Sequence, residues 1–220
     1  MIQTVTIQFP EIKLKTRDAH KLRGYFGNLF KEYSPLLHNH YETGELRYKY
    51  PLVQYKVLNE IPTLVALNEG SQLLTQLFLK IRELKIDGQV FPILSKNIKS
   101  ELAAIGFSNE LKEYRFQTLW MGLNQENHLK YIKTGSQSEK DKLLDKILTG
   151  NVLSFFKGLD ILLESDQRIM VKSRLTEKST RFKDKDMVAF TGSFVINAHL
   201  PDGIGIGKAV SRGFGTIVNL

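Results

Sequence analysis

Apolar and polar residues alternate along the first ten positions of the chain, which predicts a strand with one buried face. The apolar side of this strand consists of Val5, Ile7 and Phe9. A helix is predicted next, because apolar residues recur at helical spacing between Asp18, which can cap its first turn, and Pro35, which stops it.

The pattern continues with two strands, a second helix and a further strand. The strands are predicted at residues 47–58 and 61–67, and the two residues between them are few enough for a hairpin turn. Residues 69–84 carry apolar side chains at helical spacing, and residues 89–94 are predicted to form the strand that closes the unit. The order β-α-β-β-α-β is that of a ferredoxin-like domain.

The second half of the chain follows the same plan less regularly. Strands are predicted at residues 114–123, 161–176, 187–199 and 214–218. A helical stretch over residues 127–158 follows the first of these strands, with breaks expected at 134–137 and Gly150. A basic connection joins the strands at 161–176 and 187–199. We therefore expect an α+β protein with two tandem ferredoxin-like (RRM-like) domains, at residues 1–95 and 112–220.

Composition narrows the class of protein. Of the 220 residues, 42% are hydrophobic and 25% charged, which are ordinary values for a folded globular chain. No apolar run approaches the ~18 residues of a membrane-spanning helix, and the first residues lack the apolar core of a signal peptide. Cysteine is absent, which excludes disulfides, thiolate catalysis and cysteine zinc sites. We expect a soluble, cytoplasmic protein with no membrane partner.

The charge balance points to an anionic partner. The chain has 31 Lys and Arg against 23 Asp and Glu, a net charge of +8. Residues 13–23 hold five basic side chains against Asp18, and residues 172–185 hold six against Glu177 and Asp184. A solvated face and a surface that tracks phosphates are both compatible with the second patch.

Glycines are concentrated near the end of the chain, at residues 203–215, which we call the glycine-rich segment (GIGIGKAVSRGFG). Glycine permits a positive φ and the close approach of another backbone, and here Lys208 and Arg212 lie among the glycines. The spacing is one residue short for a P-loop, and too few residues follow for a dinucleotide fold. A tight C-terminal hairpin is the structural alternative.

Two histidines, His38 and His40, lie between the first helix and the strand that follows. Because histidine titrates near neutral pH, such a pair can both accept and donate a proton. A zinc site would need further ligands, and only Glu42 and Glu45 are close. Two loop histidines without a role remain the other interpretation.

The glycine-rich segment resembles a known loop. Gly205–Gly215 matches the pattern G-h-G-x5-G-h-G, with h apolar, of the RAMP superfamily of CRISPR systems. The stretches LRGYFGNLF, LLHNH, YKYPLVQYKVL and NEG resemble one subgroup of the superfamily's repeat-processing endoribonucleases. The resemblance covers both ends of the chain and most of residues 20–70.

The resemblance implies a metal-independent endoribonuclease without a cofactor. In such an enzyme His38 and His40 share acid and base roles while the 2′-hydroxyl of the RNA attacks phosphorus, leaving a 2′,3′-cyclic phosphate and a 5′-hydroxyl. Lys31 and Tyr48 would be the third and fourth members of the site. Their alternatives are Tyr33, Arg47 and Lys49.

The implied partner is CRISPR repeat RNA (pre-crRNA). RNA-binding residues would be Gly205, Gly207, Lys208, Arg212, Gly213 and Gly215. Effector-complex proteins and a second copy of the chain are further partners that the resemblance allows. Two other functions remain open: a non-catalytic RAMP subunit that holds guide RNA, and an RNA-binding module unrelated to CRISPR.

Overall fold

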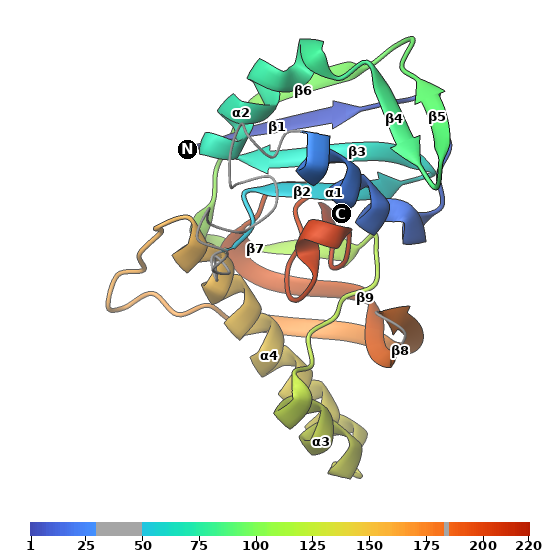
Figure 1. Ribbon diagram of the computed structural model, residues 1–220. Helices are drawn as coiled ribbons and strands as arrows, with labels where there is room; N and C mark the ends of the chain where they lie inside the picture. Colours follow the sequence, from blue (N-terminus) through green and yellow to red (C-terminus); the bar gives the residue numbers. More distant parts are fainter. Residues whose placement is uncertain (30–49, 183–184) are drawn as a thin grey trace, which may run out of the picture. The chain divides into compact units, whose positions relative to one another are not determined.

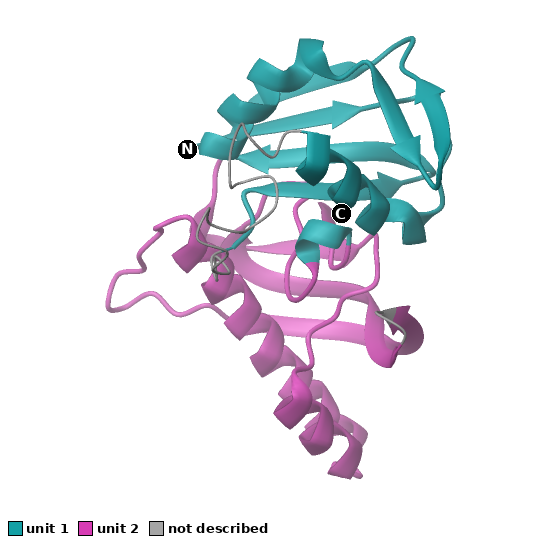
Figure 2. Cartoon of the chain, viewed as in Figure 1, with its two compact units in different colours: residues 1–103, 210–213 teal, residues 104–209, 214–220 magenta. Residues whose placement is uncertain are grey.

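The computed structural model describes residues 1–29, 50–182 and 185–220, drawn in colour in Figure 1. Contacts within the chain divide it into two compact units, shown in Figure 2. The first unit contains residues 1–103 and 210–213, and the second contains residues 104–209 and 214–220. Each combines a four-stranded antiparallel sheet with helices, so the predicted fold class is confirmed.

The sheet of the first unit has the order β2-β3-β1-β6. Its strands are β1 (Ile2–Gln8), β2 (Val53–Leu58), β3 (Ile61–Leu67) and β6 (Asn97–Ala103). β2 and β3 form the predicted hairpin, whose turn residues Asn59 and Glu60 both have positive φ, at 49° and 65°. Positive φ at both positions is the geometry that matches the twist of two paired strands.

Two helices supply the apolar side chains that cover one face of this sheet (Figure 1). They are α1 (Ala19–Leu29), preceded by the short 3-10 helix η1 (Thr16–Asp18), and α2 (Glu69–Leu77), followed by η3 (Phe78–Lys80). The ring of Phe26 stacks on the rings of Tyr55 and Phe9, with centroids 5.8 and 6.3 Å apart. Tyr55 is therefore a core residue, as its position in the strand pattern predicts.

The first sheet is not closed by the predicted strand. Residues 89–94 are expected to close it, but β5 (Gln89–Pro92) pairs only with β4 (Glu83–Ile86) in a separate hairpin. The predicted helix over residues 69–84 consequently ends early. Asp87 and Gly88 both have positive φ, which favours this tight turn. The closing strand is β6, an exposed edge strand whose solvated side chains hide the alternation of a buried one.

The second unit repeats the strand order of the first, as β10-β7-β9-β8. Its strands are β7 (Gly106–Phe116), β8 (Val171–Phe182), β9 (Lys185–His199) and β10 (Ile217–Asn219). α3 (Gln125–Lys133) and α4 (Gln137–Gly158) follow β7, and α4 packs on β8. Between β9 and β10, where a ferredoxin-like unit has its second helix, lies the glycine-rich segment with the single turn η4 (Val210–Arg212).

Four predictions for the second unit are wrong, and one of them is the strand at residues 161–176, because β8 begins only at Val171. A strand is predicted at residues 114–123, but β7 begins at Gly106 and ends at Phe116. The pattern misses its start because the first half of β7 is mostly polar and does not alternate. α4 runs through Gly150, where the burial of Leu148 and Val152 on either side outweighs the ~1 kcal/mol cost of a helical glycine. The basic residues of segment 172–185 that the structure describes lie on β8 and β9 and not in a connection between them.

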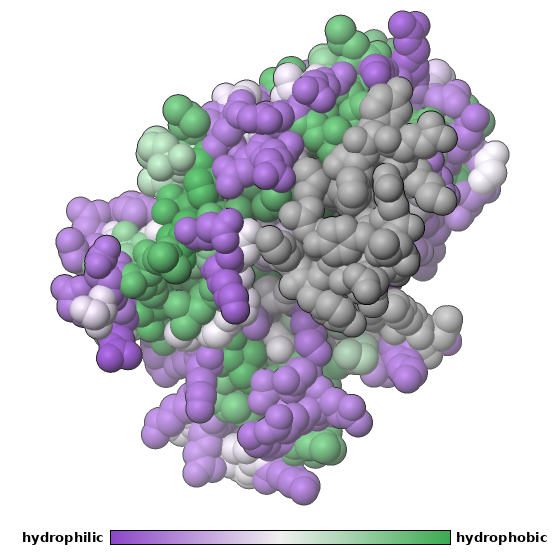
Figure 3. Space-filling view, turned by 60° about the vertical axis from the view of Figure 1, so that its left-hand side comes forward, coloured by the Kyte–Doolittle hydropathy of each residue, from purple (hydrophilic) through white to green (hydrophobic). Residues whose placement is uncertain are grey.

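Aromatic side chains fill the core of the second unit. The ring of Phe116 stacks on that of Trp120, with centroids 5.6 Å apart, and lies tilted against that of Phe194 at 5.2 Å. On the face seen in Figure 3, hydrophilic and hydrophobic side chains are interspersed over the described surface. Among the described residues, none of the helices is both long and apolar enough to cross a membrane.

Candidate RNA interface

The predicted catalytic residues lie at positions that the structure does not describe: Lys31, His38, His40 and Tyr48. The elements that flank this segment are described, since α1 ends at Leu29 and β2 begins at Val53. α1 and β2 both belong to the first unit and pack on each other.

The glycine-rich segment begins and ends with paired backbone in the second unit. The N–H of Ile206 donates to the carbonyl of Gly215 at 2.9 Å, and Gly205 forms a bridge with Thr216. The N–H of Gly215 also donates to the carbonyl of Leu119 at 2.8 Å. The two ends thus pair like a hairpin, and residues 207–214 form the loop between them.

Two of the predicted glycines make contacts that a side chain would prevent. A Cβ at Gly207 would lie 2.6 Å from Nε1 of Trp120, and one at Gly215 would lie 2.1 Å from the carbonyl oxygen of Ile206. The φ angles of both glycines are positive, at 100° and 64°. Trp120 is itself held by donation from its Nε1 to Oδ1 of Asn151 at 3.2 Å. These two glycines are needed for backbone packing, whatever ligand the loop binds.

A hydrogen bond fixes the backbone of Lys208, while its side chain is exposed. Its N–H donates to the carbonyl of Met121 at 2.9 Å, and the following Ala209 has the positive φ of 55°. The residue is exposed, and partial burial of the ammonium lowers its pKa. The loop therefore presents a cation on a fixed backbone, an arrangement suited to an anionic ligand.

Arg212 and Gly213 belong to the first unit, where η4 packs on both α1 and β2. A Cβ at Gly213 would lie 2.8 Å from the Cβ of Ala19 and 3.3 Å from the carbonyl oxygen of Tyr55. Since Gly213 fits closely against α1, Arg212 is fixed beside the same helix. The predicted binding residues are accordingly divided between the units, with Gly205, Gly207, Lys208 and Gly215 in the second.

Four basic side chains share one face of the second sheet with Glu113. Arg174 of β8 and Arg115 of β7 are both in register with Ser193 of β9, so the two arginines lie on one face of the sheet. Lys172 and Lys178 lie on the same side of β8 as Arg174. These three residues and Arg115 are all exposed. The sheet fixes the distances between these basic side chains. This face therefore suits a polyanion better than a connecting loop would.

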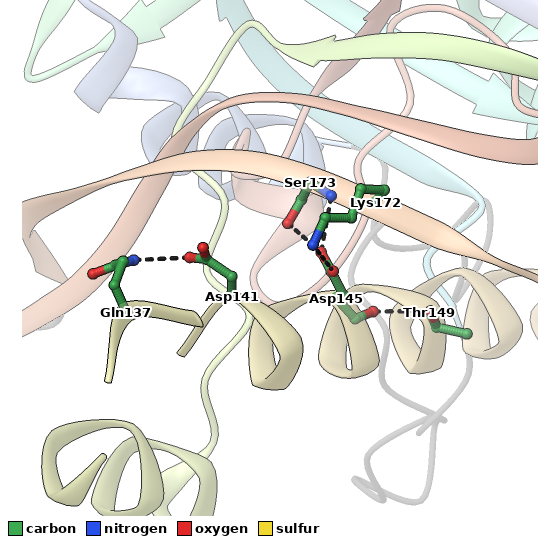
Figure 4. A network of polar contacts seen from close by, with 6 residues as sticks. All are labelled: Gln137, Asp141, Asp145, Thr149, Lys172 and Ser173. Carbon is green, nitrogen blue, oxygen red and sulfur yellow. Dashed lines mark hydrogen bonds and ion pairs between the residues drawn. The ribbon is translucent and has the colours of Figure 1, made fainter. Parts of the chain in front are cut away.

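Lys172 also takes part in a structural network, shown in Figure 4. Its ammonium lies 3.1 Å from Asp145 of α4, whose other carboxylate oxygen accepts from the N–H and the hydroxyl of Ser173 at 2.8 and 2.6 Å. Asp145 thereby fastens α4 to β8. The positive charge of Lys172 is partly compensated, so Arg115, Arg174 and Lys178 are the stronger candidates for contact with RNA.

No metal site is evident in the part of the chain that the structure describes. Across residues 1–29, 50–182 and 185–220, no three His, Asp or Glu side chains are grouped so that they could hold a metal ion.

Two tandem ferredoxin-like units with a glycine-rich loop before the last strand define a class, the RAMP proteins that process CRISPR repeats. Family models extend this to the whole chain: the Cas6b N-terminal domain matches residues 1–103, and the Cas6b C-terminal domain matches residues 106–220. The chain belongs to the Cas6b family. The resemblance stated from the sequence is confirmed at this level.

Two solved structures match the full length of the chain, and one further relative matches two thirds of it. A crystal structure of Cas6b has a TM-score of 0.94 at 33% identity, covering 100% of this chain and 99% of that one. A structure named CRISPR RNA processing endoribonuclease Cas6b has a TM-score of 0.80 at 30% identity, with the same coverage. An uncharacterized protein of Methanocaldococcus jannaschii is 33% identical over 148 residues, which are 66% of this chain and 97% of that protein.

Proposed function

We propose that this protein is an endoribonuclease that cuts CRISPR precursor RNA within its repeats, with the RNA's own 2′-hydroxyl as nucleophile. The observation that carries the proposal is the Cas6b match across both units, including the segment that contains His38 and His40. One relative at 30% identity is named a CRISPR RNA processing endoribonuclease. The cations of the glycine-rich segment and of the second sheet supply the surface that such a substrate requires.

The proposed reaction is an internal transfer at phosphorus. One histidine takes the proton of the 2′-hydroxyl as the bond from the 2′-oxygen to phosphorus forms. The other histidine gives a proton to the 5′-oxygen as its bond to phosphorus breaks. Lys31 and Tyr48 would stabilise the negative charge that develops on the phosphate oxygens. The products are a 2′,3′-cyclic phosphate and a 5′-hydroxyl, and no water or metal hydroxide enters the reaction.

The RNA would be held by the glycine-rich segment and its neighbours. Gly205, Gly207, Gly213 and Gly215 let backbone pass close to other groups, and Lys208 and Arg212 would bind phosphates. Removing either cation should weaken binding and reduce the slope of log affinity against log salt by about 0.7 for each phosphate that is no longer neutralised. Assembly with effector proteins or with a second copy of the chain remains a prediction.

The nucleophile can be tested with a modified substrate. A repeat RNA with one 2′-deoxy nucleotide immediately upstream of the scissile phosphate should bind but not be cut. It should therefore compete with normal repeat RNA. Normal cleavage of the deoxy substrate, or a product with a 5′-phosphate, would show that an external nucleophile acts and that the mechanism is wrong.

The histidine pair is tested by replacing both His38 and His40 with Ala. Cleavage should be abolished while affinity for the repeat RNA stays within a few fold, because the change removes both proton-transfer groups and little of the binding surface. His128→Ala on α3 is the matched control and should cleave normally. If the wild-type protein itself binds repeat RNA tightly and never cuts it, the non-catalytic guide-RNA subunit is the correct function.

A further inference from the structure

β6 is the outermost strand of the first sheet (Figure 1). Among the described strands it pairs with β1 alone, and six of its seven residues are exposed. An open strand edge presents backbone donors and acceptors to any other strand, and folded proteins usually blunt or cover such an edge. The open edge of β6 is therefore a candidate surface for a partner.

The pairing of β1 on its other side shows how the backbone of β6 is turned. The N–H of Asn68 donates to the carbonyl of Gln3 at 2.9 Å, so Gln3 directs its backbone groups towards β3. Because these directions alternate along a strand, the next residue, Thr4, directs its own towards β6, where it is in register with Glu101. Glu101 thus points its N–H and C=O towards β1, and its two neighbours in β6 point theirs towards the open edge.

Three residues of β6 present their backbone groups at this edge: Ile98, Ser100 and Leu102. Their side chains lie on the face of the sheet that carries Val5 and Ile7, because Val5 is in register with Ser100 and Ile7 with Ile98. Val5 and Ile7 are fully buried, whereas Ile98 is 40% and Leu102 65% exposed. The apolar layer of the first unit thus continues to the open edge, where it is exposed to solvent.

The sequence of β6 is complementary to itself in the antiparallel direction. When two copies are paired about Ser100, Ile98 of each faces Leu102 of the other, and these are hydrogen-bonded positions. Lys99 of each copy then faces Glu101 of the other, at the non-hydrogen-bonded position where side chains approach most closely. Within one copy Lys99 already lies 2.6 Å from Glu101, so pairing would produce a cluster of four alternating charges.

We infer that β6 is a dimerisation strand, through which two copies of this chain join their first sheets into one continuous antiparallel sheet. The interface is isologous, with its two-fold axis at Ser100. A second copy is the partner that fits, because both the apolar positions and the charges of β6 are matched by β6 itself. The inference is independent of the proposed function, since the pairing needs no RNA.

Exchange of the charges tests the interface. Lys99→Glu makes both charges at the facing positions negative, and Glu101→Lys makes both positive, so each variant should self-associate at least about tenfold more weakly than the wild type. An equimolar mixture of the two variants should recover association, because opposite charges again face each other. Both variants lose the ion pair within the chain, so only a contact between copies explains recovery in the mixture.

Sedimentation of the full chain without RNA measures this association. A single strand pair is smaller than the standard interface of about 1,600 Å², so the wild type should associate weakly. Concentrations up to about 1 mM detect such a dimer. A wild type that stays monomeric over this range would overturn the inference, and so would a mixture of the two charge variants that stays monomeric.

Backbone pairing is tested with proline. Ser100→Pro removes an N–H that points to the open edge, a position where edge strands tolerate proline. It should weaken self-association at least about tenfold and leave the thermal midpoint nearly unchanged. Glu101→Pro, which removes an N–H directed to β1, is the matched control and should lower the midpoint. A dimer that persists in both Ser100→Pro and the charge variants would place the interface elsewhere and overturn the inference.

Discussion

Lys56 on β2 is a buried lysine. Its side chain is fully buried, and burial lowers its pKa to about 7 because the ammonium is poorly solvated there. In the unfolded chain the pKa is near the ordinary value of 10.5. Between these values the unfolded chain binds more protons than the folded one, so this residue makes the protein more stable as the pH rises from 7 towards 10.

Lys56→Met removes this dependence. The free energy of unfolding of the variant, relative to that of the wild type, should fall by up to about 1.4 kcal/mol per pH unit from pH 7 towards pH 10. Urea unfolding at a series of pH values measures it. Lys99→Met, which replaces an exposed lysine, should show no such trend. A difference that is the same at every pH would contradict the prediction.

Glycine residues in the first unit differ in what they permit. At Gly213 a side chain would meet Ala19 at 2.8 Å with φ at 89°, whereas at Gly24 on α1 it would meet nothing within 4 Å. Gly213→Ala should therefore cost about 1–3 kcal/mol of stability. Gly24→Ala should gain about 0.5–1 kcal/mol by favouring the helix. Denaturant unfolding of both variants checks this, and equal effects would show that η4 packs loosely on α1.

Between elements, the packing of α4 on β8 depends on one carboxylate. Asp145 accepts two hydrogen bonds from the buried Ser173 and forms one ion pair with the exposed Lys172. Asp145→Ala should cost about 1–3 kcal/mol, because it leaves buried donors without this acceptor. Lys172→Ala should cost less than about 1 kcal/mol, as exposed ion pairs usually do. If the lysine variant were the less stable one in urea unfolding, the ion pair and not the hydrogen bonds would fasten the helix.

Elements with a buried face are predicted well. β3 has the predicted bounds of Ile61–Leu67, and α1 begins one residue after the predicted cap, because apolar periodicity reports burial directly. The sequence pattern misses β6 and the first half of β7 because their side chains are largely exposed and do not alternate. Sequence patterns therefore describe buried strands better than exposed ones.

The candidate site is predictable only as far as local motifs reach. The glycine-rich segment stands out in the sequence because of its spacing. The packing of Gly213 against Ala19 and Tyr55 does not, because it joins residues far apart in the chain. The burial of Lys56 is equally hidden, since a lysine in a strand is normally assigned to a solvated face.

For the molecule as a whole, the net charge of +8 means that Lys and Arg side chains of the protein can neutralise the phosphates of the RNA backbone. The proposed chemistry also supplies both proton transfers from side chains. Cleavage of a short, pre-folded repeat RNA should therefore persist in excess EDTA at an unchanged rate. Absence of cleavage in EDTA with binding retained would point to hydrolysis by bound metal ions.

The sharing of residues 210–213 with the first unit sets an order for the assembly of the protein during translation. Residues 1–103 leave the ribosome early, but the turn that covers Ala19 emerges only after all of residues 104–209 have been made. Until then the nascent first unit lacks the packing of η4 on α1 and β2. A premature stop codon before position 210 would thus damage the N-terminal unit as well as the C-terminal one.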